Sequence, residues 1–310
     1  MGVFVFLPLV LPLTAWPIAR LAEHHLHPRT ATWLLTAIAA VLAVCSTLCL
    51  ALLMVVGTAQ LPGNPLPDGW SDPEVRAAVP YDEVAGKAAI PALLAVITGC
   101  SQLAWRHHRV RRDTTRALAA LPDRSVAVLP DDVPYAYALP GRRRDRVVVT
   151  AGMLAQLNGP ERRALFAHER AHLAARHHRF LLAAQLAASA NPFLRPLRTS
   201  VSYTTERWAD EEAAATTGSR RTVARAVAKA ALVTRGAPVA SLAHFAAPGP
   251  VPRRVAALLA PAPLSRAWPS VFTAAGLAAW GATAGAAVSA LSSANSAVTL
   301  FFILKAATPL

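Results

Sequence analysis

Charged residues are scarce in this sequence, and acidic residues are the scarcer kind. Only 15% of the 310 residues are Asp, Glu, Lys or Arg, whereas 54% are hydrophobic. The mean hydropathy is +0.37. A chain with so few charges is too apolar to be wholly soluble, which places it in a membrane. Acidic residues number 17 against 31 basic ones, so the formal net charge is +14.

The basic excess does not indicate a nucleic-acid partner. The sequence lacks a basic patch interleaved with aromatic residues, and it lacks any known nucleic-acid motif. Most of the excess lies beside apolar runs or between Arg106 and Arg266, where a basic face next to an anionic leaflet explains it. We therefore expect a lipid bilayer as a partner and no direct nucleic-acid binding.

Cysteine is rare as well. Cys45 and Cys49 stand four residues apart in one long apolar run, and Cys100 lies in the next run. Thiols inside membrane spans behave as small apolar residues. We therefore predict neither a disulfide nor a cysteine metal ligand.

Four apolar runs are predicted to cross the membrane, at about 3–19, 31–56, 88–105 and 267–291. The first run contains three prolines and lacks the basic start of a signal peptide, so we prefer a span there to a cleaved leader. The apolar tail 297–304 is too short to span alone. Its sequence leaves open whether it re-enters the membrane.

The distribution of arginines predicts the orientation. A basic run, 106–112, follows the third span, whereas the loop 57–84 before that span is acidic. Basic residues beside membrane spans favour the cytoplasmic side. The segment that follows the third span is therefore predicted to face the cytoplasm, with the amino terminus outside.

The most informative motif is H-E-x-x-H, formed by His168, Glu169 and His172 in a predicted helix from Pro160 to His178. Histidines four residues apart lie on one helix face, so both imidazoles can bind a single ion. Zinc takes such ligands and acidifies a bound water, and Glu169 is placed to accept the proton of that water. The alternative is a charged surface helix that carries two histidines by chance.

Two histidines do not complete a zinc site. The best candidate for the third ligand is Glu206, which shares a predicted helix face with Asp210. Asp210 is predicted to accept a hydrogen bond from a ligating histidine and so to fix its ring orientation. Taken alone, this segment would be read as an ordinary acidic helix, because Glu211 and Glu212 follow at once.

The patterns together predict an α-helical membrane protein with about four transmembrane helices and a mainly α, α+β metallopeptidase domain. The domains are 1–112 with three spans, 113–265 with the zinc motif, and 266–310 with the last span and tail. Within the middle domain we predict a helix at 114–121, strands at 125–129, 135–139 and 146–150, and a buried or interfacial helix at 180–190.

These residues resemble a family of integral-membrane metallopeptidases. The resemblance rests on the segments 133–141 and 146–154, the H-E-x-x-H helix, and the E-x-x-A-D run that starts at Glu206, and it extends over roughly 125–232. It implies a zincin-like domain of the gluzincin type, with His168, His172 and Glu206 as zinc ligands and Glu169 as general base. It also implies that a strand near 136–139 or 147–150 holds an extended substrate by edge pairing.

Two groups in this family are similar to the chain. Three spans before the motif and one after resemble the BlaR/MecR-type antirepressor peptidases, whereas the prenyl-protein and heat-shock membrane proteases resemble two before and two after. The first likeness implies a cytoplasmic or membrane-associated protein substrate such as a transcriptional repressor. No Ser-x-x-Lys motif follows the last span, so a β-lactam receptor role is not expected.

Several alternatives stay open at this point. A quality-control protease of the heat-shock type is one, and a non-proteolytic signalling or scaffold protein with a structural zinc site is another. The residue that stabilises the oxyanion is unassigned, although Tyr203 and His177 lie within sequence reach. The arginines of the block 248–254 are expected at the cytoplasmic interface. The substrate, the inducing signal and the oligomeric state are not specified by the sequence.

Overall fold

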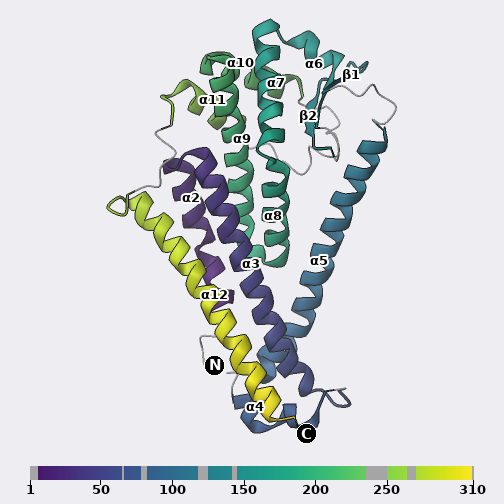
Figure 1. Cartoon of the computed structure of the whole chain (residues 1–310), viewed down its shortest axis with the longest axis vertical. Helices are drawn as coiled ribbons and strands as arrows, with labels where there is room; N and C mark the ends of the chain where they lie inside the picture. The colour runs from purple at the N-terminus through teal and green to yellow at the C-terminus, as the bar shows by residue number, and fades with distance from the viewer. Residues whose placement is uncertain are drawn as a thin grey trace.

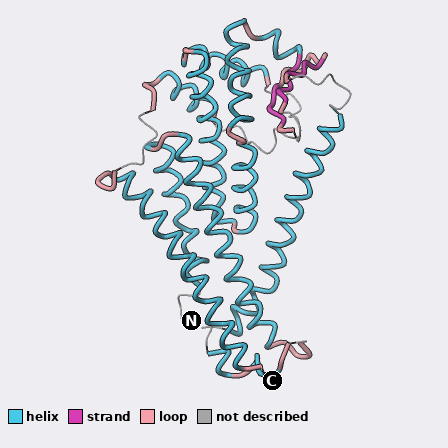
Figure 2. Tube along the Cα trace, in the orientation of Figure 1, coloured by secondary structure: helices cyan, strands magenta, loops and turns pink. Residues whose placement is uncertain are grey.

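The computed structural model describes residues 6–64, 66–77, 82–117, 125–141, 145–234, 250–263 and 270–308. Long helices make up most of this chain, and three short strands lie together near one end (Figure 2). The molecule is elongated, and its longest helices converge toward the end where the carboxyl terminus lies (Figure 1).

Three helices are long and apolar enough to cross a membrane: α3 (Pro28–Ala59), α5 (Asp82–Ala117) and α12 (Ala274–Ala306). The predicted spans 31–56 and 88–105 lie inside α3 and α5. The fourth predicted span, 267–291, corresponds to α12, but α12 starts at Ala274 and continues through the apolar tail 297–304. The residues between 291 and 297 include no proline or glycine, so nothing in them ends the helix.

The first predicted span, 3–19, is not one α-helix where the structure describes it. It consists of α1 (Leu7–Val10), a 3-10 turn η2 (Leu11–Thr14) and α2 (Ala15–His25). Pro8 and Pro12 stand at the starts of α1 and η2. Proline has no N–H donor and interrupts the helical hydrogen-bond ladder, which explains the short pieces. A crossing by this segment stays a prediction.

Helix α5 joins two predicted elements. The third span and the start of the predicted helix 114–121 form one continuous helix, which is described as far as Ala117; residues 118–121 lie outside the described residues. The predicted domain boundary after Arg112 therefore falls inside α5. Near its start, α5 contacts α3 through two glycines: a Cβ added at Gly86 would lie 2.7 Å from the Cα of Gly57. From this contact α5 diverges from the bundle toward the strands (Figure 1).

The strands agree with the predicted ones to within one residue. They are β1 (Val126–Leu129), β2 (Ala136–Leu139) and β3 (Arg146–Thr150), in the order β1-β3-β2. β3 pairs with β1 in parallel and with β2 in antiparallel register. Because β3 has a partner on each side, β2 is the one of the two candidate recognition strands that lies at an edge of the sheet formed by the described residues.

The remaining helices are α4 (Pro73–Ala77), α6 (Ala151–Gln156), α7 (Gly159–Ala174), α8 (His177–Ala190), α9 (Arg195–Thr217), α10 (Arg220–Val233) and α11 (Val251–Leu259), with 3-10 turns at Asp68–Ser71 and Pro192–Leu194. The motif helix begins as predicted, with a capping box between Asn158 and Glu161. It ends earlier than the predicted His178, because Arg176 adopts a left-handed conformation with φ 54° and redirects the chain. α8 then starts at His177.

The main hydrophobic core does not stop at the predicted domain boundary. Phe180 of α8 and Leu197 of α9 belong to the same buried cluster as Leu35 and Ile38 of α3. Phe180 also meets Trp33 edge to face, with ring centroids 4.7 Å apart. The α8–α9 hairpin therefore packs on a candidate membrane helix, and α7 precedes it at the end of the molecule away from the carboxyl terminus (Figure 1).

Candidate metal centre

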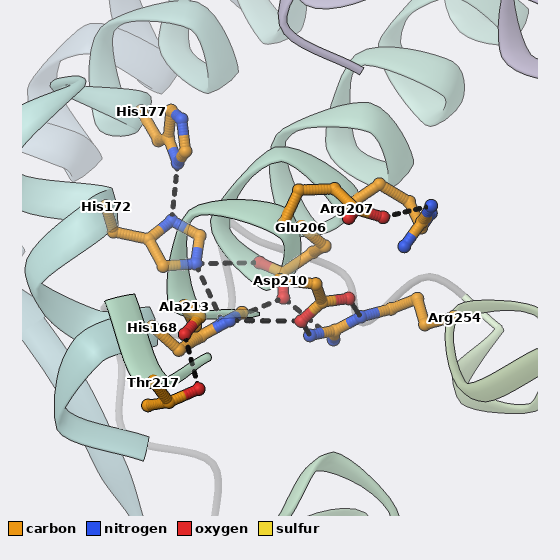
Figure 3. A network of polar contacts seen from close by, with 10 residues as sticks. His168, His172, His177, Glu206, Arg207, Asp210, Ala213, Thr217 and Arg254 are labelled. Carbon is orange, nitrogen blue, oxygen red and sulfur yellow. Dashed lines mark hydrogen bonds and ion pairs between the residues drawn. The ribbon is translucent and has the colours of Figure 1, made fainter. Parts of the chain in front are cut away.

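Three predicted ligands meet at one point (Figure 3). His168 and His172 extend from α7, and Glu206 faces them from α9. The two Nε2 atoms lie 3.1 Å apart. Glu206 Oε1 is 3.4 Å from His172 Nε2, and Oε2 is 3.5 Å from His168 Nε2. One donor atom from each residue lies within 4.8 Å of the others, so a single ion can contact all three.

The second nitrogen of each histidine also has a partner. Nδ1 of His168 lies 3.1 Å from Oδ1 of Asp210, as the sequence predicts. Nδ1 of His172 lies 2.9 Å from Nδ1 of His177, which starts α8. Such contacts fix the orientation of a ligating imidazole. Both rings are therefore held with Nε2 toward the shared point.

Neither candidate for the oxyanion role reaches the cavity. His177 is 1% exposed, and its ring packs 4.6 Å from that of Trp208, behind His172. Tyr203 is buried beneath the guanidinium of Arg253, which lies 4.4 Å from its ring centroid. Both side chains are absent from the cavity lining. His177 orients a candidate ligand, and Tyr203 supports the packing of α11 on α9.

Arg254 is the central residue that the sequence did not reveal. Its Nε and Nη2 donate to Oδ2 and Oδ1 of Asp210, at 2.8 and 2.7 Å, and its Nη1 lies 2.8 Å from Oε2 of Glu206. It is 6% exposed, so the expectation that it anchors at the membrane interface is wrong. Its neighbour Arg253 donates to Glu23 of α2 at 2.9 Å. α11 therefore connects the amino-terminal segment with the metal centre.

The charges of the centre are tightly coupled. Burial raises the pKa of Asp210 and Glu206, but Arg254 outweighs it and lowers the pKa of Asp210 to about 2 and that of Glu206 well below its ordinary value. Burial also opposes the charged form of His168, yet Asp210 and Glu206 raise its pKa to about 10. For His172, burial prevails and lowers the pKa to about 4. Metals bind an ionised carboxylate and a neutral imidazole, so an ion that binds here would displace the proton of His168.

Glu169 lies beside the ligands and lines the same cavity. Its carboxylate accepts a hydrogen bond from the backbone of Ala138 in β2. Burial raises its pKa to about 7, against the opposing effects of His168 and of this hydrogen bond. The predicted general base therefore faces both the metal centre and the edge strand.

The cavity has a volume of about 440 Å³. Residues 135–140, which include β2, form one side of it, and apolar side chains of α8 and α10 form much of the remainder. Cavities of this size and character bind ligands in many proteins. The centre therefore opens into a space that can accept part of a polypeptide chain.

A protein-family model matches the part of the sequence that contains the H-E-x-x-H motif. Peptidase family M48 matches residues 101–194, from within α5 to the turn after α8. The match includes His168, Glu169 and His172, whereas Glu206 and Arg254 lie beyond it. It supports a metallopeptidase of the M48 kind, and the finer likeness to the BlaR/MecR group stays a prediction. No curated protein and no solved structure matches the chain.

Proposed function

We propose that this chain is a membrane-embedded zinc endopeptidase that hydrolyses peptide bonds of a cytoplasmic or membrane-associated protein. One observation carries the proposal: the donor atoms of His168, His172 and Glu206 converge in a cavity, with the carboxylate of Glu169 beside them. The match to Peptidase family M48, which includes the motif, supports the same class of enzyme. The three apolar helices support the membrane location.

The side chains of the centre suit zinc. Two imidazole nitrogens and one carboxylate are a common ligand set for catalytic zinc, which keeps one position open, whereas structural zinc sites are closed by four protein ligands. Within the described ranges, three His, Cys, Asp or Glu side chains form this group. The supporting contacts of Asp210 and His177 also fit ligating histidines. The donor set therefore favours an enzyme over a scaffold with a structural site.

The residues around the centre divide the work of peptide hydrolysis. A zinc ion held there would lower the pKa of a bound water to about 7 and polarise a substrate carbonyl. Glu169 accepts a proton from the attacking water and donates it to the nitrogen of the departing amine. β2 offers its edge to an extended substrate, because in the described sheet it pairs only with β3.

The cellular role is proposed mainly on the sequence. The basic run 106–112 beside α5 favours a cytoplasmic catalytic centre. The likeness to antirepressor peptidases suggests regulatory proteolysis of a transcriptional repressor. The position of the centre beside membrane helices suits a substrate that is itself near the bilayer.

Zinc content and casein hydrolysis of the full chain in detergent test the proposal. We expect wild type to hold one zinc ion and cleave casein, as should a Glu83→Gln control on the exposed side of α5. Glu169→Gln should retain zinc and lose activity by roughly 10²–10⁴-fold, because it removes the general base. Glu206→Ala should lose zinc affinity.

A different pattern of results would contradict the enzyme assignment. If Glu169→Gln cleaved casein at the wild-type rate with zinc bound, Glu169 would not be the base. If no preparation cleaved casein or other unfolded proteins while all retained zinc, the centre would be a structural site.

A further inference from the structure

The cavity contains a second group of polar side chains, away from the metal centre. His107 and Arg111 reach it from α5, and His178 reaches it from α8. We call these three residues the basic wall. The three residues are close enough to affect one another. Burial, followed by the positive charge of Arg111 and the other basic neighbours, lowers the pKa of His178 to about 4. A pKa of about 4 leaves His178 neutral at pH 7, so Arg111 is the main carrier of positive charge in the basic wall, and the imidazoles beside it offer hydrogen bonds.

The basic wall lies at one end of the edge strand. Nη2 of Arg111 donates to the carbonyl oxygen of Pro140, 3.3 Å away, directly after β2. Two residues earlier, the backbone of Ala138 contacts Glu169. Two residues of extended chain span roughly 7 Å. A substrate that pairs with β2 would therefore bring a side chain within one or two positions of the scissile bond to Arg111.

The cavity provides few acidic groups that could balance this charge. Among the described residues that line it, the acidic side chains are Glu169 and Glu206, and both belong to the metal centre. The bond from Arg111 to a carbonyl does not neutralise the guanidinium. The nearby acid on α5, Asp113, is exposed and pairs with Arg109 and Arg116. An acidic ligand would therefore complement the basic wall.

We infer that the basic wall binds an aspartate or glutamate side chain of the substrate close to the scissile bond, and that Arg111 sets this preference. The inference rests on the proposed function and adds a substrate class to it. A guanidinium binds carboxylates through short, charge-assisted hydrogen bonds, and a partly enclosed cavity strengthens the attraction. The apolar walls from α8 and α10 suit uncharged neighbours of that residue.

A substrate side chain fits better than a lipid phosphate. The basic wall shares a cavity with Glu169 and stands at the end of the strand that would align a peptide. Its end of α5 follows the apolar stretch, so an anionic headgroup is the competing ligand. The test below separates the two ligands.

The test compares cleavage sites in a random peptide library. The full chain, loaded with zinc in detergent, cleaves the library, and mass spectrometry identifies the residues around each cut. The variants are Arg111→Gln and Arg111→Glu. The control is Arg112→Glu, which makes the same charge change at an adjacent exposed residue outside the cavity lining.

We expect wild type to prefer Asp or Glu over Asn or Gln at one position, on the order of tenfold. Arg111→Gln should lose the preference, and Arg111→Glu should shift it toward Lys and Arg. The control should keep the wild-type preference. Each preference is a ratio within one preparation, so partial misfolding of a variant does not alter it.

Each other outcome overturns the inference in a distinguishable way. A wild type that cleaves without charge preference, or Arg111→Glu that keeps an acidic preference, overturns it and leaves the proposed function intact. A wild type that cleaves nothing overturns both. A third outcome would assign the basic wall to lipid phosphate. In it, phosphatidylglycerol in nanodiscs changes the cleavage rate of wild type but not of Arg111→Glu, and both proteins prefer the same residues around the cut.

Discussion

Replacing Arg254 with methionine should be the most damaging change outside the predicted ligands. The guanidinium makes contacts of 2.7 and 2.8 Å with Asp210, which is 0% exposed, and one of 2.8 Å with Glu206. Methionine fills a similar space but leaves both carboxylates without this cation. Removing one partner from a buried ion pair costs about 3–5 kcal/mol. That is a large part of the roughly 5–15 kcal/mol that stabilises a typical domain.

The loss should depend on the metal. Zinc places positive charge beside the same two carboxylates, so it offsets part of the missing guanidinium. We therefore expect Arg254→Met to lose more stability after chelation than in zinc, measured by unfolding with sodium dodecyl sulfate in mixed micelles. Zinc affinity should fall as well, because Glu206 and Asp210 lose the group that positions them.

Two further variants make this prediction specific. Asp210→Asn combined with Arg254→Met removes one of the two buried carboxylates that lose their counterion, so the double variant should be more stable than Arg254→Met alone. Arg253→Met changes the neighbouring arginine, whose side chain is 38% exposed and pairs with Glu23; this carboxylate keeps the hydrogen bond from Ser200, so the change should cost less. The reasoning would be refuted if Arg254→Met cost no more than Arg253→Met, or if the double variant were the least stable of all.

Three other predictions concern His177, the glycine contact between α3 and α5, and Glu161. His177→Phe keeps an aromatic ring but removes the partner of His172, a predicted ligand, so zinc affinity should fall about 10–100-fold in a chelator competition; an unchanged affinity would contradict this role. Gly86→Ala should destabilise the bundle by about 1–3 kcal/mol through overpacking against α3. Gly281→Ala, with nothing within 4 Å of the added Cβ, should instead be neutral or stabilising. Burial raises the pKa of Glu161, but the hydrogen bond from Lys229 lowers it below its ordinary value. Ionised Glu161 therefore stabilises the fold above about pH 4.3, and this contribution disappears as the pH falls through the lowered pKa; Glu161→Gln should thus destabilise at pH 7 and have little effect in acid.

The sequence predicts those parts of the centre that depend on local periodicity. His168 and His172 are one helical turn apart, and so are Glu206 and Asp210, so each pair lies on one face whatever the tertiary fold. The structure then packs α7 against α9 and brings the two faces together. The short strands were also predictable, because prolines and glycines separate them.

Contacts between distant segments were beyond such reasoning. Arg254 lies in an arginine pair that has no spacing relation to the motif, and its burial depends on how α11 packs on α9. The break at Arg176 is equally hidden, because a left-handed arginine carries no composition signal. This break brings His177 behind the motif helix, whereas a continuous helix would have carried it past His172. The continuity of α5 was missed because the basic run after the span looked like a boundary.

The position of Arg254 in the chain also gives the centre an order of assembly. During synthesis α7 and α9 leave the ribosome first, and this arginine follows Asp210 by 44 residues. Until α11 docks, the nascent chain has the five functional side chains of both motifs but not the guanidinium that holds Glu206 and Asp210 in place. The proposed hydrolytic centre would thus be among the last parts of the protein to form. We expect a newly made chain to be inactive until α11 has packed on α9.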